Sequence, residues 1–126
     1  MALKEIQGEF PGSFRIPGTD AAIKLGMKVI GYDPEITVDA AWRLHSGVRK
    51  ANSIEELLKQ SDFVSLHVPL VPATRGLIDA RRLTAMRPGS VLLNFARDAI
   101  VDEVAVAASR RFKRSRSAEN IWAPRA

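Results

Sequence analysis

The sequence predicts an α/β fold with a doubly wound parallel sheet, and two observations support this fold class. Short apolar runs alternate with segments of helical periodicity, and turn residues such as Gly and Pro separate them. Strand, helix, strand, helix, strand is the order that right-handed crossovers give to a parallel sheet. The chain has 126 residues, of which 46% are hydrophobic and 26% charged, so one globular domain is expected.

The first expected elements are a helix and a strand. Residues Thr19–Leu25, followed by Gly26, match a helix that ends at a glycine. Met27–Tyr32 is a short apolar run closed by a turn that begins at Asp33, which predicts a strand buried on both faces. Whether residues 1–7 supply a further strand stays open from the sequence.

A capping box predicts the next helix. Ser53 lies three residues before Glu56, so each side chain can satisfy a free backbone amide at the start of a helix over Ser53–Gln60. Asp62–Val68 then predicts a second strand. Pro69 ends this strand, because proline cannot continue the hydrogen bonding of a central ladder.

Two aspartates mark the remaining helices. Asp79 is a candidate N-cap for a short helix over Ala80–Met86. A Pro-Gly turn follows, and the apolar run Ser90–Ala96 predicts a third strand. Asp102 can cap one more helix near the end of the chain.

The positive charge is confined to one end of the chain. The sequence carries 19 basic and 14 acidic residues, a net charge of +5, yet residues 1–103 are neutral and the whole excess lies in residues 104–126. The run RRFKRSRS dominates this segment. We therefore predict a globular body over residues 1–103 and a basic C-terminal tail over residues 104–126.

Composition excludes several classes of protein. The absence of cysteine excludes disulfides, thiolate metal sites and a cysteine nucleophile. With His45 and His67 as the two histidines, we expect no metal site, and we favour a structural role for His67 over a general base. No long apolar stretch or signal peptide is found, so we expect a cytoplasmic protein with no membrane partner.

The predicted topology gathers chemistry at one edge of the sheet. Open parallel sheets bind ligands beyond the carboxyl ends of their strands. Asp33 ends the first predicted strand, Val68 the second, and Arg97 follows the third. An acid at such a position can accept hydrogen bonds from ribose hydroxyls, and an arginine can hold a carboxylate in two parallel hydrogen bonds. This edge suits an anionic substrate beside a nucleotide.

Three motifs resemble one enzyme family. The segments KLGMKVIGYDP, SDFVSLHVPLVPATRGLID and MRPGSVLLNFARDAIVDE follow one another between Lys24 and Glu103. Together they closely resemble the NAD-binding domain of the D-isomer-specific 2-hydroxyacid dehydrogenases, and the NFARD form is most similar to the phosphoglycerate dehydrogenase branch. The resemblance implies a Rossmann-like fold that is incomplete here, with residues 1–103 as a partial NAD-binding domain.

The resemblance also implies roles for single residues. Asp33 corresponds to the acid that binds the adenosine ribose, and Val68 lines the cofactor cleft. Phe95, Ala96 and Arg97 match the segment beside the nicotinamide. Arg97 also matches the catalytic arginine, which holds the substrate carboxylate. Since its guanidinium is a permanent cation, Arg97 cannot be the base.

Two parts of the family pattern differ in this chain. Family spacing places the three glycines of the phosphate-binding turn at Phe10, Gly12 and Arg15, and only the middle position is glycine. The family's glutamate and histidine, which work as an acid/base pair, fall beyond the last residue when counted from Arg97. We therefore expect weak or no turnover from this chain alone.

Three functional hypotheses follow. The leading one is an NAD-dependent oxidoreductase of the phosphoglycerate dehydrogenase type, which oxidises 3-phosphoglycerate to 3-phosphohydroxypyruvate in serine biosynthesis. Its partners would be NAD and a small 2-hydroxy acid, and exposed sheet edges would allow a homo-oligomer. The alternative is a non-catalytic dinucleotide-binding remnant. The third, an RNA-binding protein that uses the basic tail, is disfavoured because nothing else in the sequence resembles a nucleic-acid module.

Overall fold

The structure is a computed structural model that describes residues 2–4, 22–33, 38, 42, 47–115 and 120–125. The strands in this part of the chain are β1 (Ala2–Lys4), β2 (Val29–Tyr32), β3 (Val48–Lys50), β4 (Phe63–Leu66), β5 (Val91–Asn94), β6 (Phe112–Arg114) and β7 (Ile121–Pro124). The helices are α3 (Ile54–Gln60), α4 (Ala80–Ala85) and α5 (Glu103–Ala108), with a 3-10 turn η1 (Asp98–Ile100).

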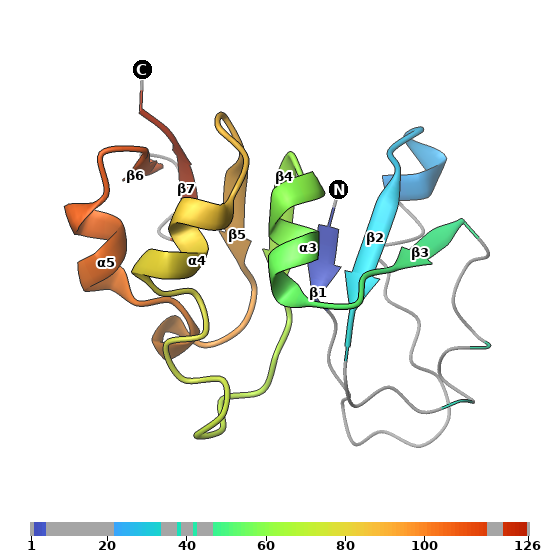
Figure 1. The fold of residues 1–126 in the computed structure, drawn as a ribbon, viewed down its shortest axis with the longest axis horizontal. Coiled ribbons are helices and arrows are strands. Elements are labelled where there is room, and N and C mark those ends of the chain that lie inside the picture. Colours follow the sequence, from blue (N-terminus) through green and yellow to red (C-terminus); the bar gives the residue numbers. More distant parts are fainter. Residues whose placement is uncertain are drawn as a thin grey trace.

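The strands form one sheet with the order β3-β2-β1-β4-β5-β7-β6 (Figure 1). The first five strands in this order are parallel, whereas β7 is antiparallel to both β5 and β6. The chain winds outward from β1 in one direction to β3, and then returns to β4 and β5 on the other side. This is the order of a Rossmann-type sheet, with its topological switch point between β1 and β4. The predicted fold class is therefore confirmed.

The start of the chain supplies the central strand. Ala2 lies opposite Ile30 of β2 on one side and opposite Val64 of β4 on the other. In the order of the sheet, β1 is thus the only described strand that joins the β2–β3 half to the β4–β5 half. The sequence left open whether residues 1–7 supply a further strand, and this pairing shows that Ala2–Lys4 does.

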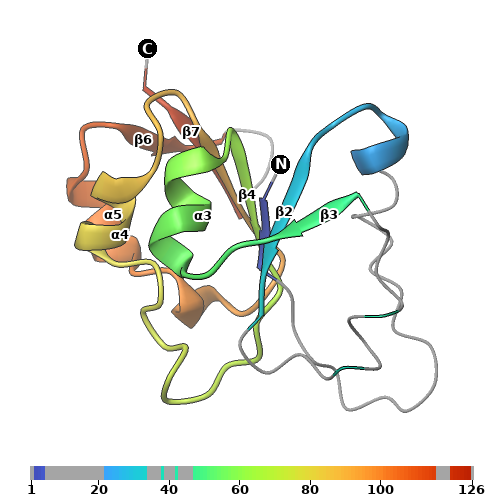
Figure 2. The same cartoon turned by 45° about the vertical axis from the view of Figure 1, so that its right-hand side comes forward.

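Helices α3, α4 and α5 lie together over one face of the sheet, as Figures 1 and 2 show. The register aligns four side chains beneath them in one row across β2, β4, β5 and β7, and all four are buried: Ile30, Val64, Leu92 and Trp122. On the opposite face, Ala22 and Val29 form a second small cluster. Gly26 follows the helical turn at Ala22 with a φ of 82°, which fits the expected glycine at its end.

Local side-chain caps start all three helices where the sequence predicts them. Ser53, Asp79 and Asp102 each accept a hydrogen bond from the backbone N–H three residues later, at 3.1, 3.0 and 3.1 Å. Glu56 completes the first cap by accepting from the backbone N–H of Asn52 at 2.7 Å. Each cap satisfies an amide that has no partner within its own helix.

Residues after Val104 continue the fold of the body. They complete α5 and then add the β6–β7 hairpin to the sheet, and Phe112 and Trp122 are buried in the main core. Arg114 forms an ion pair with Glu103 at 2.5 Å and lies over the ring of Trp122. Arg125 donates to the carbonyl of Phe112 at 2.8 Å.

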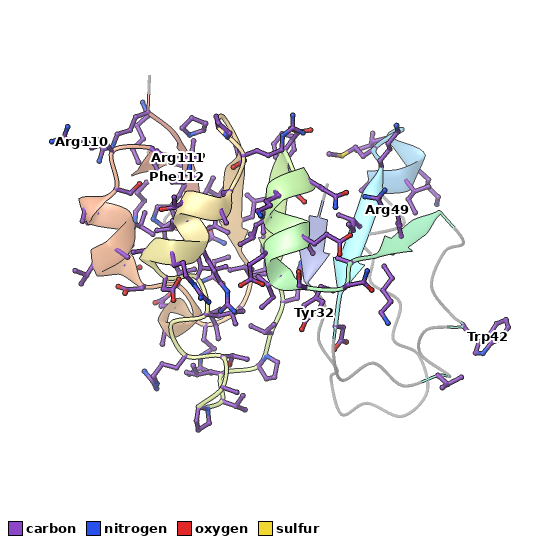
Figure 3. The ribbon with its side chains drawn as sticks, in the orientation of Figure 1. Tyr32, Trp42, Arg49, Arg110, Arg111 and Phe112 are labelled. Atoms are coloured by element: carbon purple, nitrogen blue, oxygen red, sulfur yellow. The ribbon has the colours of Figure 1, made fainter. Side chains whose placement is uncertain are left out.

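Arg111 ties this hairpin to α4. Its guanidinium donates to three carbonyls at the end of that helix, those of Leu83 at 3.3 Å, Thr84 at 3.0 Å and Met86 at 2.6 Å. The last carbonyls of a helix have no partner within the helix and carry partial negative charge, so a guanidinium there stabilises the helix end. Figure 3 shows Arg111 and Phe112 side by side at this corner of the molecule.

We predict that Arg111→Ala lowers the free energy of unfolding by about 2 kcal/mol, because three charge-assisted hydrogen bonds are lost from a partly buried site. Urea unfolding followed by circular dichroism measures this change. Arg110→Ala is the matched control, since Arg110 is exposed, and it should change stability by less than about 0.5 kcal/mol. Equal stability of the two variants would show that the cap is not a stabilising contact.

Candidate functional site

The carboxyl ends of β2, β4 and β5 lie level with one another. The register pairs Lys4 with both Tyr32 and Leu66, and pairs Leu66 with Asn94. The residues that come next on the three strands are Asp33, His67 and Phe95. Neighbouring strands are about 4.8 Å apart, so the backbone of Asp33 lies on the order of 14 Å from that of Phe95, with the switch point between them. This edge lies at the bottom of the sheet in Figure 1.

Asn94 shapes the loop that carries Arg97. Its side-chain oxygen accepts the backbone N–H of Ala96 at 2.9 Å, and its side-chain nitrogen donates to the carbonyl of Arg97 at 3.1 Å. Asn94 is 3% exposed, so these bonds form away from solvent. The side chain thereby bends the backbone as soon as β5 ends.

Asn94 is itself held by Asn120, which lies just before β7. The Asn94 backbone donates to the Asn120 carbonyl at 2.9 Å, and the Asn120 side chain donates to the Asn94 carbonyl at 3.0 Å. Sequence reasoning missed both asparagines. The signal for Asn94 was present, because Asn at the end of a strand often bonds the backbone two residues later, whereas nothing local indicates Asn120.

The loops after β4 and β5 are joined by backbone hydrogen bonds. The N–H of Gly76 donates to the carbonyl of Ala99 at 2.8 Å, and the N–H of Ile78 donates to that of Ile100 at 3.1 Å. The N–H of Asp102 donates back to Ile78 at 2.9 Å. These bonds join the second and third sequence motifs directly after Arg97 in the chain.

The predicted site residues occupy this edge in different environments. Asp33 is partly buried directly after β2, Val68 is buried after β4, and Ala96 is partly buried against the core. Arg97 is exposed, and no described carboxylate lies within ion-pair distance of its guanidinium. The edge thus combines a carboxylate, an apolar wall and an accessible cation.

His67 is anchored within the edge. Its Nε2 lies 2.7 Å from the Ser65 hydroxyl, and its ring stacks on Phe95 with centroids 5.5 Å apart and an interplanar angle of 16°. Burial lowers the pKa of His67 below its ordinary value, because the charged form loses solvation. Phe95 is 59% exposed, so its ring leaves an aromatic surface open to a ligand. The contacts of His67 agree with the structural role expected from the sequence.

Three further expectations concern the phosphate-binding turn, metal ligands and membrane-spanning helices. The positions Phe10, Gly12 and Arg15, which family spacing assigns to the phosphate-binding turn, lie outside the described residues. Among the residues that the structure describes, no group of three or more His, Asp or Glu side chains could hold a metal ion. A search of the same residues finds no helix long and apolar enough to cross a membrane.

The sheet order and this edge define a dinucleotide-binding domain of the Rossmann type. Residues 19–118 match the family model for the NAD binding domain of the D-isomer specific 2-hydroxyacid dehydrogenases. The chain belongs to this family, and its cofactor class is the NAD of that domain. The match continues past Glu103, where the motif resemblance ends, into the basic segment.

Named relatives agree with the family. The chain is 51% identical over 88 residues to an (S)-sulfolactate dehydrogenase of Chromohalobacter salexigens, covering 69% of this chain and 28% of that protein. It is 41% identical over 81 residues to a D-3-phosphoglycerate dehydrogenase of Methanocaldococcus jannaschii, covering 64% of this chain and 15% of that protein. The chain therefore spans less than a third of the length of these relatives.

Solved structures show the same arrangement. The TT0316 protein of Thermus thermophilus superposes with a TM-score of 0.66 at 36% identity, over 87% of this chain and 32% of that one. An NAD-complexed D-isomer specific 2-hydroxyacid dehydrogenase of Lactobacillus delbrueckii superposes with a TM-score of 0.66 at 28% identity, over 84% of this chain and 30% of that one.

We predict a pH-dependent contribution of His67 to stability. The folded pKa of His67 lies below the ordinary value of 6.5, so the unfolded chain binds more protons below pH 6.5. The free energy of unfolding therefore decreases as the pH is lowered from 6.5 toward the folded pKa. His67→Gln should flatten this dependence between pH 6.5 and the folded pKa, as measured by urea unfolding at several pH values. His45→Gln, at the other histidine of the sequence, is the comparison, and an unchanged slope in His67→Gln would contradict the prediction.

Proposed function

We propose that this chain is the cofactor-binding part of an NAD-dependent oxidoreductase that acts on a small 2-hydroxy acid. The observation that carries the proposal is the geometry of this edge. The turn at Asn94 exposes Arg97 at the carboxyl ends of the strands, the same edge at which Asp33 lies. A parallel sheet places its ligand at this edge, across the switch point. Both an acid for a ribose and a cation for a carboxylate are present there.

The described residues fit the cofactor. Asp33 directly follows β2 and is partly buried, so its carboxylate can accept hydrogen bonds from the two adenosine ribose hydroxyls. Phe95 is 59% exposed, so its ring offers an apolar surface for the nicotinamide, and the buried Val68 and the partly buried Ala96 keep this part of the edge apolar. NAD, when bound, supplies the hydride acceptor for oxidation of the hydroxyl carbon.

Arg97 acts on the substrate in this proposal. Its planar guanidinium can bind a carboxylate through two parallel hydrogen bonds and so orient the hydroxyl carbon toward the nicotinamide face. It also stabilises negative charge on the oxygen of the developing carbonyl. Three backbone hydrogen bonds join the neighbouring loops, and the Arg97 carbonyl accepts from Asn94, so the backbone that carries the cation is restrained before substrate arrives.

For the substrate, we propose a 2-hydroxy acid that carries a second anionic group. The names of the two relatives, a sulfolactate dehydrogenase and a phosphoglycerate dehydrogenase, support this class, since sulfolactate and 3-phosphoglycerate are both three-carbon 2-hydroxy acids with an anion on carbon 3. Oxidation of 3-phosphoglycerate to 3-phosphohydroxypyruvate, a step of serine biosynthesis, remains our first candidate.

We predict that Asp33→Ala weakens NAD binding by at least about tenfold, because two charge-assisted hydrogen bonds to the ribose are lost. Isothermal titration calorimetry measures this affinity. Asp62→Ala removes an exposed acid at the opposite edge of the sheet and should leave it unchanged. If no heat is detected at millimolar NAD, the chain does not bind the cofactor and this part of the proposal fails.

We predict that any NADH formation from 3-phosphoglycerate or sulfolactate is abolished by Arg97→Ala and strongly reduced by Arg97→Lys, because lysine cannot form the bidentate pair. Absorbance at the NADH band follows the reaction, with Arg110→Ala as the control for loss of one exposed arginine. Binding of NAD without turnover of either acid would favour the non-catalytic dinucleotide-binding remnant instead.

A further inference from the structure

A hollow lies at the edge of the sheet opposite the candidate site, at the amino ends of the strands. Its volume is about 930 Å³, within the range of pockets that hold organic ligands. Val29 and Phe63 line it, and each precedes the residue that pairs with Ala2. The hollow therefore lies in line with β1, between the amino ends of β2 and β4. Asp33 and Arg97 are at the other ends of their strands.

One side of the hollow is apolar. Val29 belongs to the cluster on the face away from α3, where Ile23 and Met27 pack against it. Phe63 alternates with the buried Val64, which faces the core under α3, so the Phe63 ring lies on the same outer face as Val29. Phe63 is 41% exposed. A ring of this size at a concave surface can bury the apolar body of a ligand.

The other side of the hollow is positively charged. Among the described residues, Arg49, Lys59 and Arg87 line it, and Asp62 is the described carboxylate in the lining. Asp62 forms an ion pair with Arg87 at 3.0 Å, and Arg49 donates a hydrogen bond to the neutral side chain of Gln60. The described side chains of the lining therefore carry an excess of positive charge. Figure 3 shows Arg49 near the amino ends of β2 and β3, far from Tyr32 at the other end.

The backbone does not add to this positive charge. Lys59 and Gln60 belong to the last turn of α3, whose carbonyl end carries partial negative charge. Attraction of an anion must therefore come from the side chains alone. This argues against a polyphosphate, which binds best at the amino ends of helices, and favours a single charge on an apolar body.

We propose that this hollow binds a small amphipathic monoanion, a carboxylate or sulfonate attached to an aliphatic or aromatic body. The apolar part lies against the partly buried Met27 and the exposed Phe63, and the charged group lies among the cations beside α3. This site is separate from the NAD edge and is independent of the oxidoreductase proposal. A ligand there would contact β2, β4 and α3 at once, so its binding would stabilise the folded sheet.

The probe is 8-anilinonaphthalene-1-sulfonate, and its uncharged analogue N-phenyl-1-naphthylamine is the matched control. Fluorescence titration should give an affinity for the sulfonate at least about fivefold higher than for the neutral probe at low salt, and the difference should shrink at high salt as the cations are screened. Equal affinities at low salt would overturn the proposal. Displacement of the sulfonate by NAD would also overturn it, because the probe would then occupy the cofactor edge.

Three variants locate the probe. Lys59→Glu should weaken sulfonate binding about fivefold, Asp62→Asn should strengthen it, and Phe63→Ser should weaken both probes. Because partly unfolded proteins also bind this probe, strengthening by Asp62→Asn counts as support only when the near-ultraviolet circular dichroism spectrum is unchanged. Lys113→Glu makes the same charge change at an exposed residue of β6, at the far end of the sheet, and should leave binding unchanged. Circular dichroism checks that each variant folds, and identical affinities in Lys59→Glu and Lys113→Glu would refute the location.

Competition identifies the class of occupant. Dodecanoate should displace the sulfonate probe, since it joins a carboxylate to an aliphatic chain. An extended peptide of alternating glutamate and leucine should not displace it, because the proposed occupant carries a single charge on one apolar body. Displacement by the peptide but not by dodecanoate would assign the hollow to a polypeptide partner and overturn the proposal.

Discussion

The parallel pairing of β1 with both β2 and β4 is the contact on which the rest of the structure depends. Three residues, Ala2–Lys4, join two groups of strands that have no other neighbour in common within the described sheet. Asp33 follows a strand on one side of this join, and the Arg97 loop follows a strand on the other. The relative position of the two halves of the candidate site is therefore fixed by β1, even though β1 provides neither residue.

A second constraint acts at the end of β5. The backbone must turn sharply there to expose Arg97 without leaving buried polar groups unpaired, and Asn94 meets both requirements with its own side chain. Asn120 then satisfies the Asn94 backbone from the hairpin at the end of the chain. Residues in the basic segment thus support a loop of the candidate site, and the composition boundary at Val104 does not coincide with a boundary in the packing.

The charge of that segment has a structural explanation. Arg111 caps α4, Arg114 pairs with Glu103 and covers Trp122, and Arg125 bonds the backbone of β6. Basic side chains on a strand at the edge of a sheet also hinder pairing with another chain, because like charges would be brought together. These roles weaken the electrostatic argument for an RNA partner, since several of the cations already have partners within the fold.

The sequence by itself determined the features that depend on local chemistry. The N-caps Ser53, Asp79 and Asp102 and the strand end before Asp33 could be assigned from neighbouring residues, because a cap or a turn is satisfied within a few positions. The second strand was predicted too long, since β4 ends at Leu66, ahead of Pro69. The three motifs likewise indicated the family. Only the tertiary structure decided that Ala2–Lys4 is the central strand, that Asn120 supports Asn94 and that Arg111 caps α4. These contacts join residues far apart in the chain, and a short polar or apolar segment carries no local mark of its distant partner.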